Sequence, residues 1–159
     1  MSYKGLINIF SRREVTKVYE AFCWGVPIPI AGIINKPLTD YINRKKISLN
    51  TYGKQAITEY KVKKNYDNYF SFLECKILTG RTHQIRVHMK SENCPLIGDS
   101  LYSRDRNLPS AISNKLSKTI RQFKRQALHS KKLIFNHPVS NRLLSFSSEM
   151  PQDMKVLEK

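Results

Sequence analysis

The segment Leu78-Thr79-Gly80-Arg81-Thr82-His83-Gln84-Ile85-Arg86-Val87-His88-Met89 decides how the middle of this chain folds. An alternating, strand-like pattern ends at its start, and Gly80 marks a turn. The spacing then becomes helical, because Ile85 and Met89 lie four residues apart and share one face of a helix. The segment therefore predicts a strand that turns into a helix with a buried apolar face.

Basic side chains gather where this predicted helix begins. Thr82 is a suitable N-cap, so the first turn is predicted at residues 83–86 and the end of the helix between residues 92 and 95. Arg81, His83 and Arg86 surround the helix start. A helix N-terminus with two guanidinium groups favours an anion, although a merely solvated basic surface is the alternative reading.

Segments on both sides of this helix alternate between apolar and polar residues, as strands do. Residues 56–64 and 69–78 flank a turn-like cluster at 65–68 and predict an antiparallel hairpin. The other predictions are a strand at 16–24, an extended edge segment at 33–38, a loop at 40–53, a short helix or long loop at 113–123, a second hairpin from 128–135 and 143–146, and a short helix after Met150. Together they predict an α+β fold with a mostly antiparallel mixed sheet and a few helices.

Composition and charge narrow the classes of function. The 159 residues suffice for one domain, and the formal net charge of +16 attracts a polyanion, most often nucleic acid. Charge alone does not separate RNA from DNA or from an acidic membrane face, and a lysine-rich soluble surface is the plain alternative. We find no membrane span, secretion leader or metal-ligand spacing, and expect a cytoplasmic protein with buried thiols at Cys23, Cys75 and Cys94.

The motifs of the chain resemble those of the RluA-type pseudouridine synthases. TGRTHQIRVHM at 79–89 resembles their third motif, and the resemblance continues in order from about Phe10 to the C-terminus. The further matching segments are KVYEA at 17–21, GKQAITEY at 53–60, PLIGDSLY at 95–102, RQALHS at 125–130, His137-Pro138 and MPQDM at 150–154. The resemblance is strongest to the enzymes that act on large-subunit ribosomal RNA, and it covers the C-terminal portion of their catalytic domain over residues 1–159.

The resemblance implies roles for named residues. Members of this family isomerise uridine to pseudouridine in RNA with one aspartate, after the target nucleotide is flipped from its stack, and need neither metal nor organic cofactor. Tyr19 matches the tyrosine that stacks on the flipped base, Ile85 the apolar residue beneath it, and Arg86 the arginine that pairs with the aspartate. Arg81 and His83 are expected to contact RNA or to support the site. Independently of the resemblance, the basic charge leads us to expect RNA contacts from Arg44, Lys45 and Lys46. We therefore expect Tyr19, Ile85 and Arg86 to line one cleft.

One family motif is not found in these 159 residues. The catalytic aspartate of the family lies in an R-L-D-x-x-T-S-G segment before the K-x-Y-x-A motif, and Asp99 belongs to a different family motif, G-D-x-x-Y. We expect this chain alone to be inactive, to lack the N-terminal RNA-binding domain, and to leave Arg86 uncompensated, turned to solvent or holding an anion. The alternatives are a non-catalytic RNA-binding remnant, or one half of an enzyme completed by a separately encoded N-terminal half. Exposed sheet edges and apolar surface are also expected.

Overall fold

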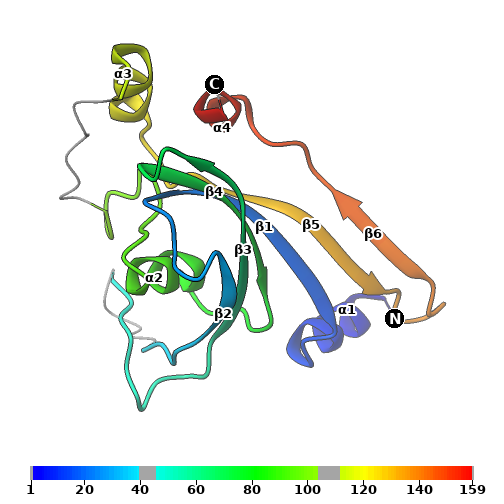
Figure 1. Ribbon diagram of the computed structural model, residues 1–159. Coiled ribbons are helices and arrows are strands. Elements are labelled where there is room, and N and C mark those ends of the chain that lie inside the picture. Colours follow the sequence, from blue (N-terminus) through cyan, green and yellow to red (C-terminus); the bar gives the residue numbers. More distant parts are fainter. Residues whose placement is uncertain (1, 40–45, 104–111, 159) are drawn as a thin grey trace.

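The structure is a computed structural model that describes residues 2–39, 46–103 and 112–158 (Figure 1). Its helices and strands follow in the order α1 (Ser2–Ser11), β1 (Val15–Trp24), β2 (Ala31–Asn35), β3 (Ile57–Tyr66), β4 (Phe70–Ile77), α2 (Gln84–Ser91), α3 (Asn114–Gln122), β5 (Leu128–Asn136), β6 (Leu143–Ser147), α4 (Gln152–Lys155) and a 3-10 turn (Val156–Glu158).

The six strands form one sheet in the order β2-β3-β4-β1-β5-β6, and every neighbouring pair is antiparallel. This confirms the predicted α+β class and both predicted hairpins, β3–β4 and β5–β6. It also confirms an edge strand at this place, although β2 covers Ala31–Asn35 and only overlaps the extended segment predicted at 33–38. Because each pair is antiparallel, short turns suffice for the hairpins, and the sheet brings β1 to its centre between β4 and β5.

The β3–β4 hairpin turns slightly later than predicted. β3 continues to Tyr66, beyond its predicted end at residue 64, and β4 begins at Phe70, so the turn lies at residues 67–69 instead of 65–68. The rings of Tyr66 and Phe70 stack across this turn with their centroids 4.4 Å apart. Asp67 and Asn68 have φ values of 51° and 61°, a left-handed conformation that Asp and Asn tolerate better than most residues.

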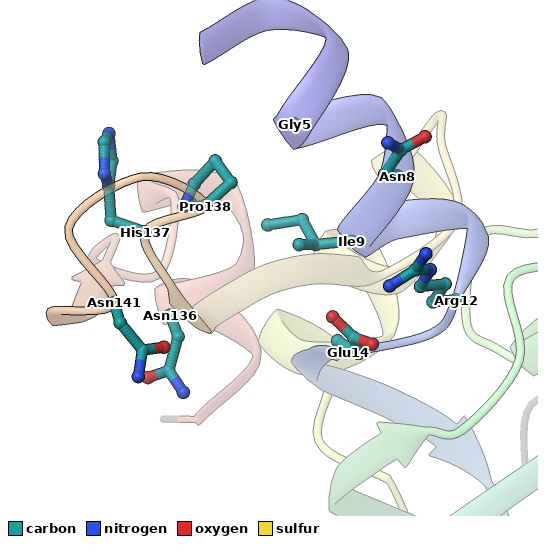
Figure 2. Close-up of a pocket in the computed structure, with 9 residues that line it drawn as sticks. All are labelled: Gly5, Asn8, Ile9, Arg12, Glu14, Asn136, His137, Pro138 and Asn141. Carbon is teal, nitrogen blue, oxygen red and sulfur yellow. The ribbon is translucent and has the colours of Figure 1, made fainter. Parts of the chain in front are cut away.

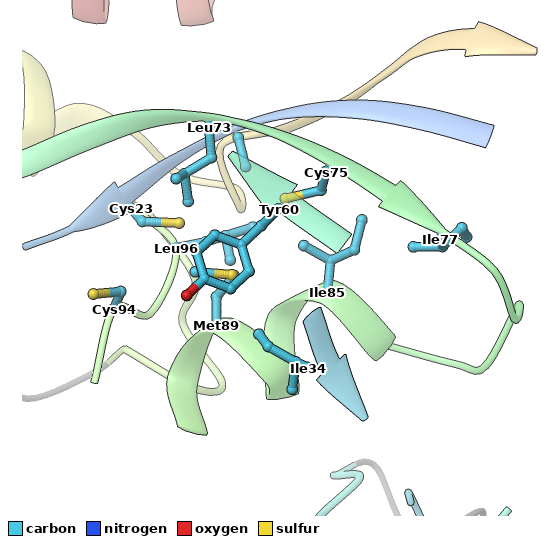
Figure 3. Packing of buried hydrophobic residues seen from close by; sticks show 11 residues of the cluster. Cys23, Ile34, Tyr60, Leu73, Cys75, Ile77, Ile85, Met89, Cys94 and Leu96 are labelled. Carbon is cyan, nitrogen blue, oxygen red and sulfur yellow. The ribbon is translucent and has the colours of Figure 1, made fainter. Parts of the chain in front are cut away.

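Alternation along β1 divides the core between the two faces of the sheet. Ala21 and Cys23 belong to the apolar cluster between the sheet and α2, and Figure 3 shows Ile85 and Met89 of that helix pointing toward the strands. The intervening Phe22 and Trp24 belong to a second cluster, which α3, α4 and the 3-10 turn help to close. Cys23, Cys75 and Cys94 are all buried, as predicted.

Two helices predicted near the C-terminal end of the chain, at 113–123 and after Met150, are present in the structure. For residues 113–123 the structure selects the helix over the loop, since Ser113 caps α3 by accepting a hydrogen bond from the amide of Leu116. The predicted C-terminal helix is present as α4. None of the described helices has the length and apolar character needed to cross a bilayer.

The sequence alone did not predict α1. Its Leu6 and Ile9 pack against Phe135 of β5 at one end of the sheet, so tertiary contacts hold a helix that its own residues specify weakly. The two outer strands carry exposed apolar side chains, as expected: Ile33 on β2, and Leu143 and Phe146 on β6.

Candidate active site

The residues assigned by resemblance meet around one pocket of about 260 Å³. Its lining includes Tyr19 from β1, and Arg81, His83, Gln84, Ile85 and Arg86 from the start of α2. Sixty-six residues separate Tyr19 from Ile85 in the sequence. The predicted convergence of Tyr19, Ile85 and Arg86 on one cleft is therefore confirmed.

Tyr19 enters this pocket from β1, next to an irregularity in the pairing of β1 with β5. Tyr19 lies opposite Cys75 on β4 and Ser130 on β5, and the register with β5 shifts between Val18 and Tyr19. The extra residue at this bulge is Lys131 of β5, so the bulge bends β5 and increases the local twist beside Tyr19. Tyr19 is half-buried, so part of its ring faces the pocket.

The start of α2 differs from the prediction. The helix begins at Gln84, its N-cap residue is His83 in a left-handed conformation with φ 54°, and no side chain caps it. Thr82 is therefore not the cap. The left-handed turn at His83 directs the chain from the end of β4 into α2 and leaves the imidazole beside the pocket.

Gln84 fixes this turn in place of a conventional cap. Its side chain is 3% exposed. Its Oε1 accepts hydrogen bonds from the Thr79 hydroxyl at 2.7 Å and the Arg81 amide at 3.1 Å, and its Nε2 donates to Ile57 O at 2.9 Å and Thr58 Oγ1 at 3.0 Å. These four bonds use the whole hydrogen-bonding capacity of the amide. The sequence analysis missed this residue, because nothing in a single sequence marks a glutamine as buried.

Arg86 is not left uncompensated, and this expectation was wrong. Its Nε donates to Asp99 Oδ2 at 2.7 Å and its Nη2 to Asp99 Oδ1 at 2.8 Å, and the Asp99 side chain is completely buried. The guanidinium also lies over the ring of Tyr102, 4.9 Å from its centroid. The pair satisfies the rule that a buried charge needs a hydrogen-bonded partner.

The local backbone prepares Asp99 for this pairing. Burial alone would raise the pKa of Asp99, but the hydrogen bonds and charge of Arg86, with the amides of Leu101 and Tyr102, outweigh it and lower the pKa. Gly98, which precedes Asp99, has φ 71°, and a Cβ there would overlap the carbonyl oxygen of Arg125. Asp99 is thus an ionised partner for Arg86, a role that the sequence analysis did not assign to it.

Tyr102, the last residue of the PLIGDSLY motif at 95–102, contacts the TGRTHQIRVHM motif at 79–89. Its hydroxyl accepts a hydrogen bond from the amide of Ile47 at 2.8 Å and lies 3.0 Å from His83 Nδ1. Burial and the charge of Arg86 lower the pKa of His83, against the opposing effect of Asp99. A neutral imidazole with Nδ1 held by Tyr102 leaves Nε2 as the ring nitrogen that can serve a ligand.

The remaining predicted residues divide into three cases. Arg81 lines the pocket, and its Nε donates to Gln55 O at 3.0 Å, so it also braces the site. Lys46 is not in the lining of this pocket; its ammonium group lies 5.9 Å from the centroid of the Tyr102 ring. Arg44 and Lys45 lie outside the residues that the structure describes.

A larger cavity of about 500 Å³ lies elsewhere, between α1 and the turn that joins β5 to β6 (Figure 2). Asn8, Arg12 and Asn141 line it, and it shares no residue with the pocket around Tyr19. The motif residue His137 shapes this turn, because its Nδ1 accepts hydrogen bonds from the amides of Val139 and Ser140. This cavity is therefore distinct from the site that the motifs form.

Comparison with known proteins agrees with the motifs. Residues 2–91 match the family model described as RNA pseudouridylate synthase. The chain is 37% identical to ribosomal large subunit pseudouridine synthase D of Vibrio cholerae over 94% of this chain and 46% of that protein. It is 40% identical to an uncharacterized RNA pseudouridine synthase of Chlorobaculum parvum over 97% of this chain and 50% of that protein.

The fold matches as well. Human RNA pseudouridylate synthase domain containing 4 superposes with a TM-score of 0.74 at 24% identity, over 98% of this chain and 67% of that chain. The chain spans about half the length of the curated relatives it matches.

Proposed function

Since this chain belongs to the RNA pseudouridylate synthase family, we propose that its pocket holds a uridine of RNA during isomerisation to pseudouridine, with large-subunit ribosomal RNA as the substrate. The observation that carries the proposal is the convergence of Tyr19, Ile85 and Arg86 on one pocket. The pocket suits a flipped pyrimidine, because it combines an aromatic ring, a buried apolar side chain and a guanidinium group.

Each side chain has a distinct task in this proposal. The ring of Tyr19 stacks on the flipped base, and Ile85, which is 4% exposed, supports the base from the helix side. A carboxylate takes part in breaking the bond between N1 and C1′, by attack or by assisting elimination. The base then rotates and is rejoined through C5, and the proton on C5 is released.

Arg86 has the donors to position that carboxylate. Asp99 occupies Nε and Nη2, and a guanidinium has five N–H groups, so those of Nη1 remain for a second carboxylate at the pocket. Asp99 thereby holds the guanidinium ready before the second acid arrives. A charged neighbour of this kind keeps a carboxylate ionised and oriented.

The 159 residues contain no Arg-Leu-Asp sequence, and we infer that the second carboxylate comes from a segment outside them. Asp99 cannot replace it, because both of its oxygens are bound to Arg86 and its side chain has no exposure. We therefore infer that this chain by itself converts no uridine. Activity then requires a segment that supplies the aspartate, in the same polypeptide or in a separate N-terminal half.

The test is a mapping experiment on unmodified 23S ribosomal RNA. The chain alone is incubated with the RNA, and pseudouridine is located by chemical adduct formation and primer extension; we expect none, since loss of the reacting group removes nearly all acceleration. A second polypeptide carrying the R-L-D-x-x-T-S-G segment is then added and should restore conversion. The same polypeptide with its aspartate replaced by asparagine should not.

Variants of the restored complex test the individual roles. Arg86→Ala should abolish turnover, and Tyr19→Phe should slow it while keeping the stacking ring. Arg142→Ala, a change at an exposed arginine away from the pocket, serves as the control and should leave turnover unchanged. Full turnover by Arg86→Ala would refute the proposed site, and a chain that only binds RNA in every combination would identify a non-catalytic RNA-binding protein.

A further inference from the structure

A second pocket of about 260 Å³ lies beside Tyr102, and the motifs assign nothing to it. Its floor consists of Ile47, Val87 and Tyr102, three buried residues of one apolar cluster. Lys46 and Lys90 are exposed and stand in its lining, on two separate segments of the chain. No acidic side chain is among the described residues that line this pocket.

This combination selects the chemistry of a ligand. The apolar floor, with the ring of Tyr102, suits a flat apolar group, and the two ammonium groups attract an anion beside it. A nucleotide offers both, because a base is joined to a phosphate through a sugar. Stacking of a base with phosphate contacts from lysines is the usual way in which proteins bind single-stranded nucleic acid.

The second pocket adjoins the proposed uridine pocket through α2 and Tyr102. Arg86 and His83 line the uridine pocket, and Val87 and Lys90 of the same helix line the second one. Four residues of a helix, from Arg86 to Lys90, span about 6 Å along its axis. Tyr102 joins the two pockets, since its hydroxyl contacts His83 and its ring contacts Arg86.

We propose that this second pocket binds a nucleotide that neighbours the target uridine in the same RNA strand, with its base on the floor and its phosphate between Lys46 and Lys90. The inference rests on the proposed function, because it takes the first pocket as the uridine site. It adds a subsite that would read the RNA next to the modified position.

Binding of short fluorescent RNA oligonucleotides to the 159-residue chain, followed by fluorescence anisotropy at several salt concentrations, tests the proposal. The double variant Lys46→Gln and Lys90→Gln should weaken binding about tenfold at low salt. It should also reduce the slope of log affinity against log salt by about 0.7, since one neutralised phosphate of a single strand contributes about that much. The matched control, Lys115→Gln with Lys118→Gln on α3, removes the same charge and should change affinity less than twofold.

A second arm tests the base. Oligonucleotides with an abasic nucleotide at each position flanking the target uridine should bind about tenfold more weakly at one position only, because stacking of one base contributes about that much. Leu49 lines the pocket and is 41% exposed, so Leu49→Ser should shrink this difference without unfolding the chain.

The outcomes separate this inference from the proposed function. If the chain binds no RNA at any salt concentration, the proposed function fails and the subsite fails with it. If RNA binds and the lysine pair behaves like the α3 control, only the subsite is refuted. Equal affinity for abasic and intact strands would refute base binding, and displacement of the strand by an equimolar free nucleoside monophosphate would show that the pocket does not need a linked strand.

Discussion

At the scale of single residues, Asp99 holds the positive charge of Arg86 at the pocket although the Arg86 side chain is largely buried. The Arg86 side chain is only 12% exposed and that of Asp99 is not exposed at all. Moving such groups out of water is costly, and bidentate pairing offsets that cost only while both partners remain. The pair therefore makes Arg86 a fixed part of the pocket wall.

The first prediction compares two ion pairs of the same geometry. Asp99→Asn leaves the Arg86 charge buried without its counter-ion and should lower the free energy of unfolding by about 3 kcal/mol or more. Asp153→Asn breaks the equally short pair with Arg125, whose partners are 40% and 46% exposed, and should cost less than about 1 kcal/mol. Urea unfolding at pH 7 measures both, and equal losses would contradict the role given to burial.

At the scale of elements, a chain of buried hydrogen bonds attaches α2 to the sheet. Gln84 Nε2 donates to Thr58 Oγ1, which lies 2.9 Å from His88 Nδ1, and His88 Nε2 lies 2.9 Å from Lys36 O. A carbonyl oxygen only accepts, so Nε2 carries the proton and Nδ1 accepts from the Thr58 hydroxyl. Each group in this chain donates a hydrogen bond to the next, from Gln84 through Thr58 and His88 to Lys36 O. Because His88 Nδ1 must accept, the imidazole is neutral. Both Gln84 and His88 thus hold the helix that presents Ile85 and Arg86.

The pH dependence of stability follows from this arrangement. Burial lowers the pKa of His88, so in the pH range below about 6.5 the unfolded chain binds a proton that the folded chain refuses. Stability should be full above that range and fall as the pH decreases, by at most about 1.4 kcal/mol between pH 7.5 and 5.5 for one histidine.

Urea unfolding at the two pH values measures this loss. His88→Gln should remove most of it, and the remainder belongs to His83, whose pKa burial also lowers. His129→Gln, at a histidine outside this hydrogen-bond chain, should retain the full loss. A pH dependence that survives in His88→Gln and His83→Gln together would contradict the assignment.

At the scale of the whole molecule, positive charge dominates. A formal net charge of +16 on 159 residues gives the chain a long-range attraction for RNA that is independent of sequence. In the proposed function, the pocket around Tyr19 adds base contacts to this attraction. Affinity for structured RNA should therefore fall steeply with rising salt.

The corresponding prediction concerns the basic run at 44–46. Replacing Arg44, Lys45 and Lys46 with Gln should weaken binding of all RNA sequences alike, because phosphate contacts carry no sequence information. Filter binding between low and physiological salt measures the loss, with Lys61, Lys63 and Lys64 of β3, changed to Gln together, as the matched control. Retention of RNA at high salt by the unaltered chain would argue against the electrostatic origin of binding.

The sequence by itself determined the strands, the presence of a helix after Gly80, and the three pocket members Tyr19, Ile85 and Arg86. Alternation at 56–64 and 69–78 reports which residues can face a core, since successive side chains of a strand point to opposite sides. The order of motifs from Lys17 to Met154 indicated the family. These features depend only on neighbouring residues or on the order of motifs along the chain, so they are visible in the sequence without the tertiary structure.

Only the tertiary structure decided which groups pair across the chain. Asp99 reaches Arg86 because Gly98 turns the backbone beside Arg125, and Gln84 replaces Thr82 as the anchor of α2 because β3 presents Ile57 O and Thr58 to it. Burial makes these bonds necessary, since a buried polar group without a partner is costly. The partner that a buried polar group finds depends on how segments distant in sequence pack together. A local sequence pattern does not specify that packing.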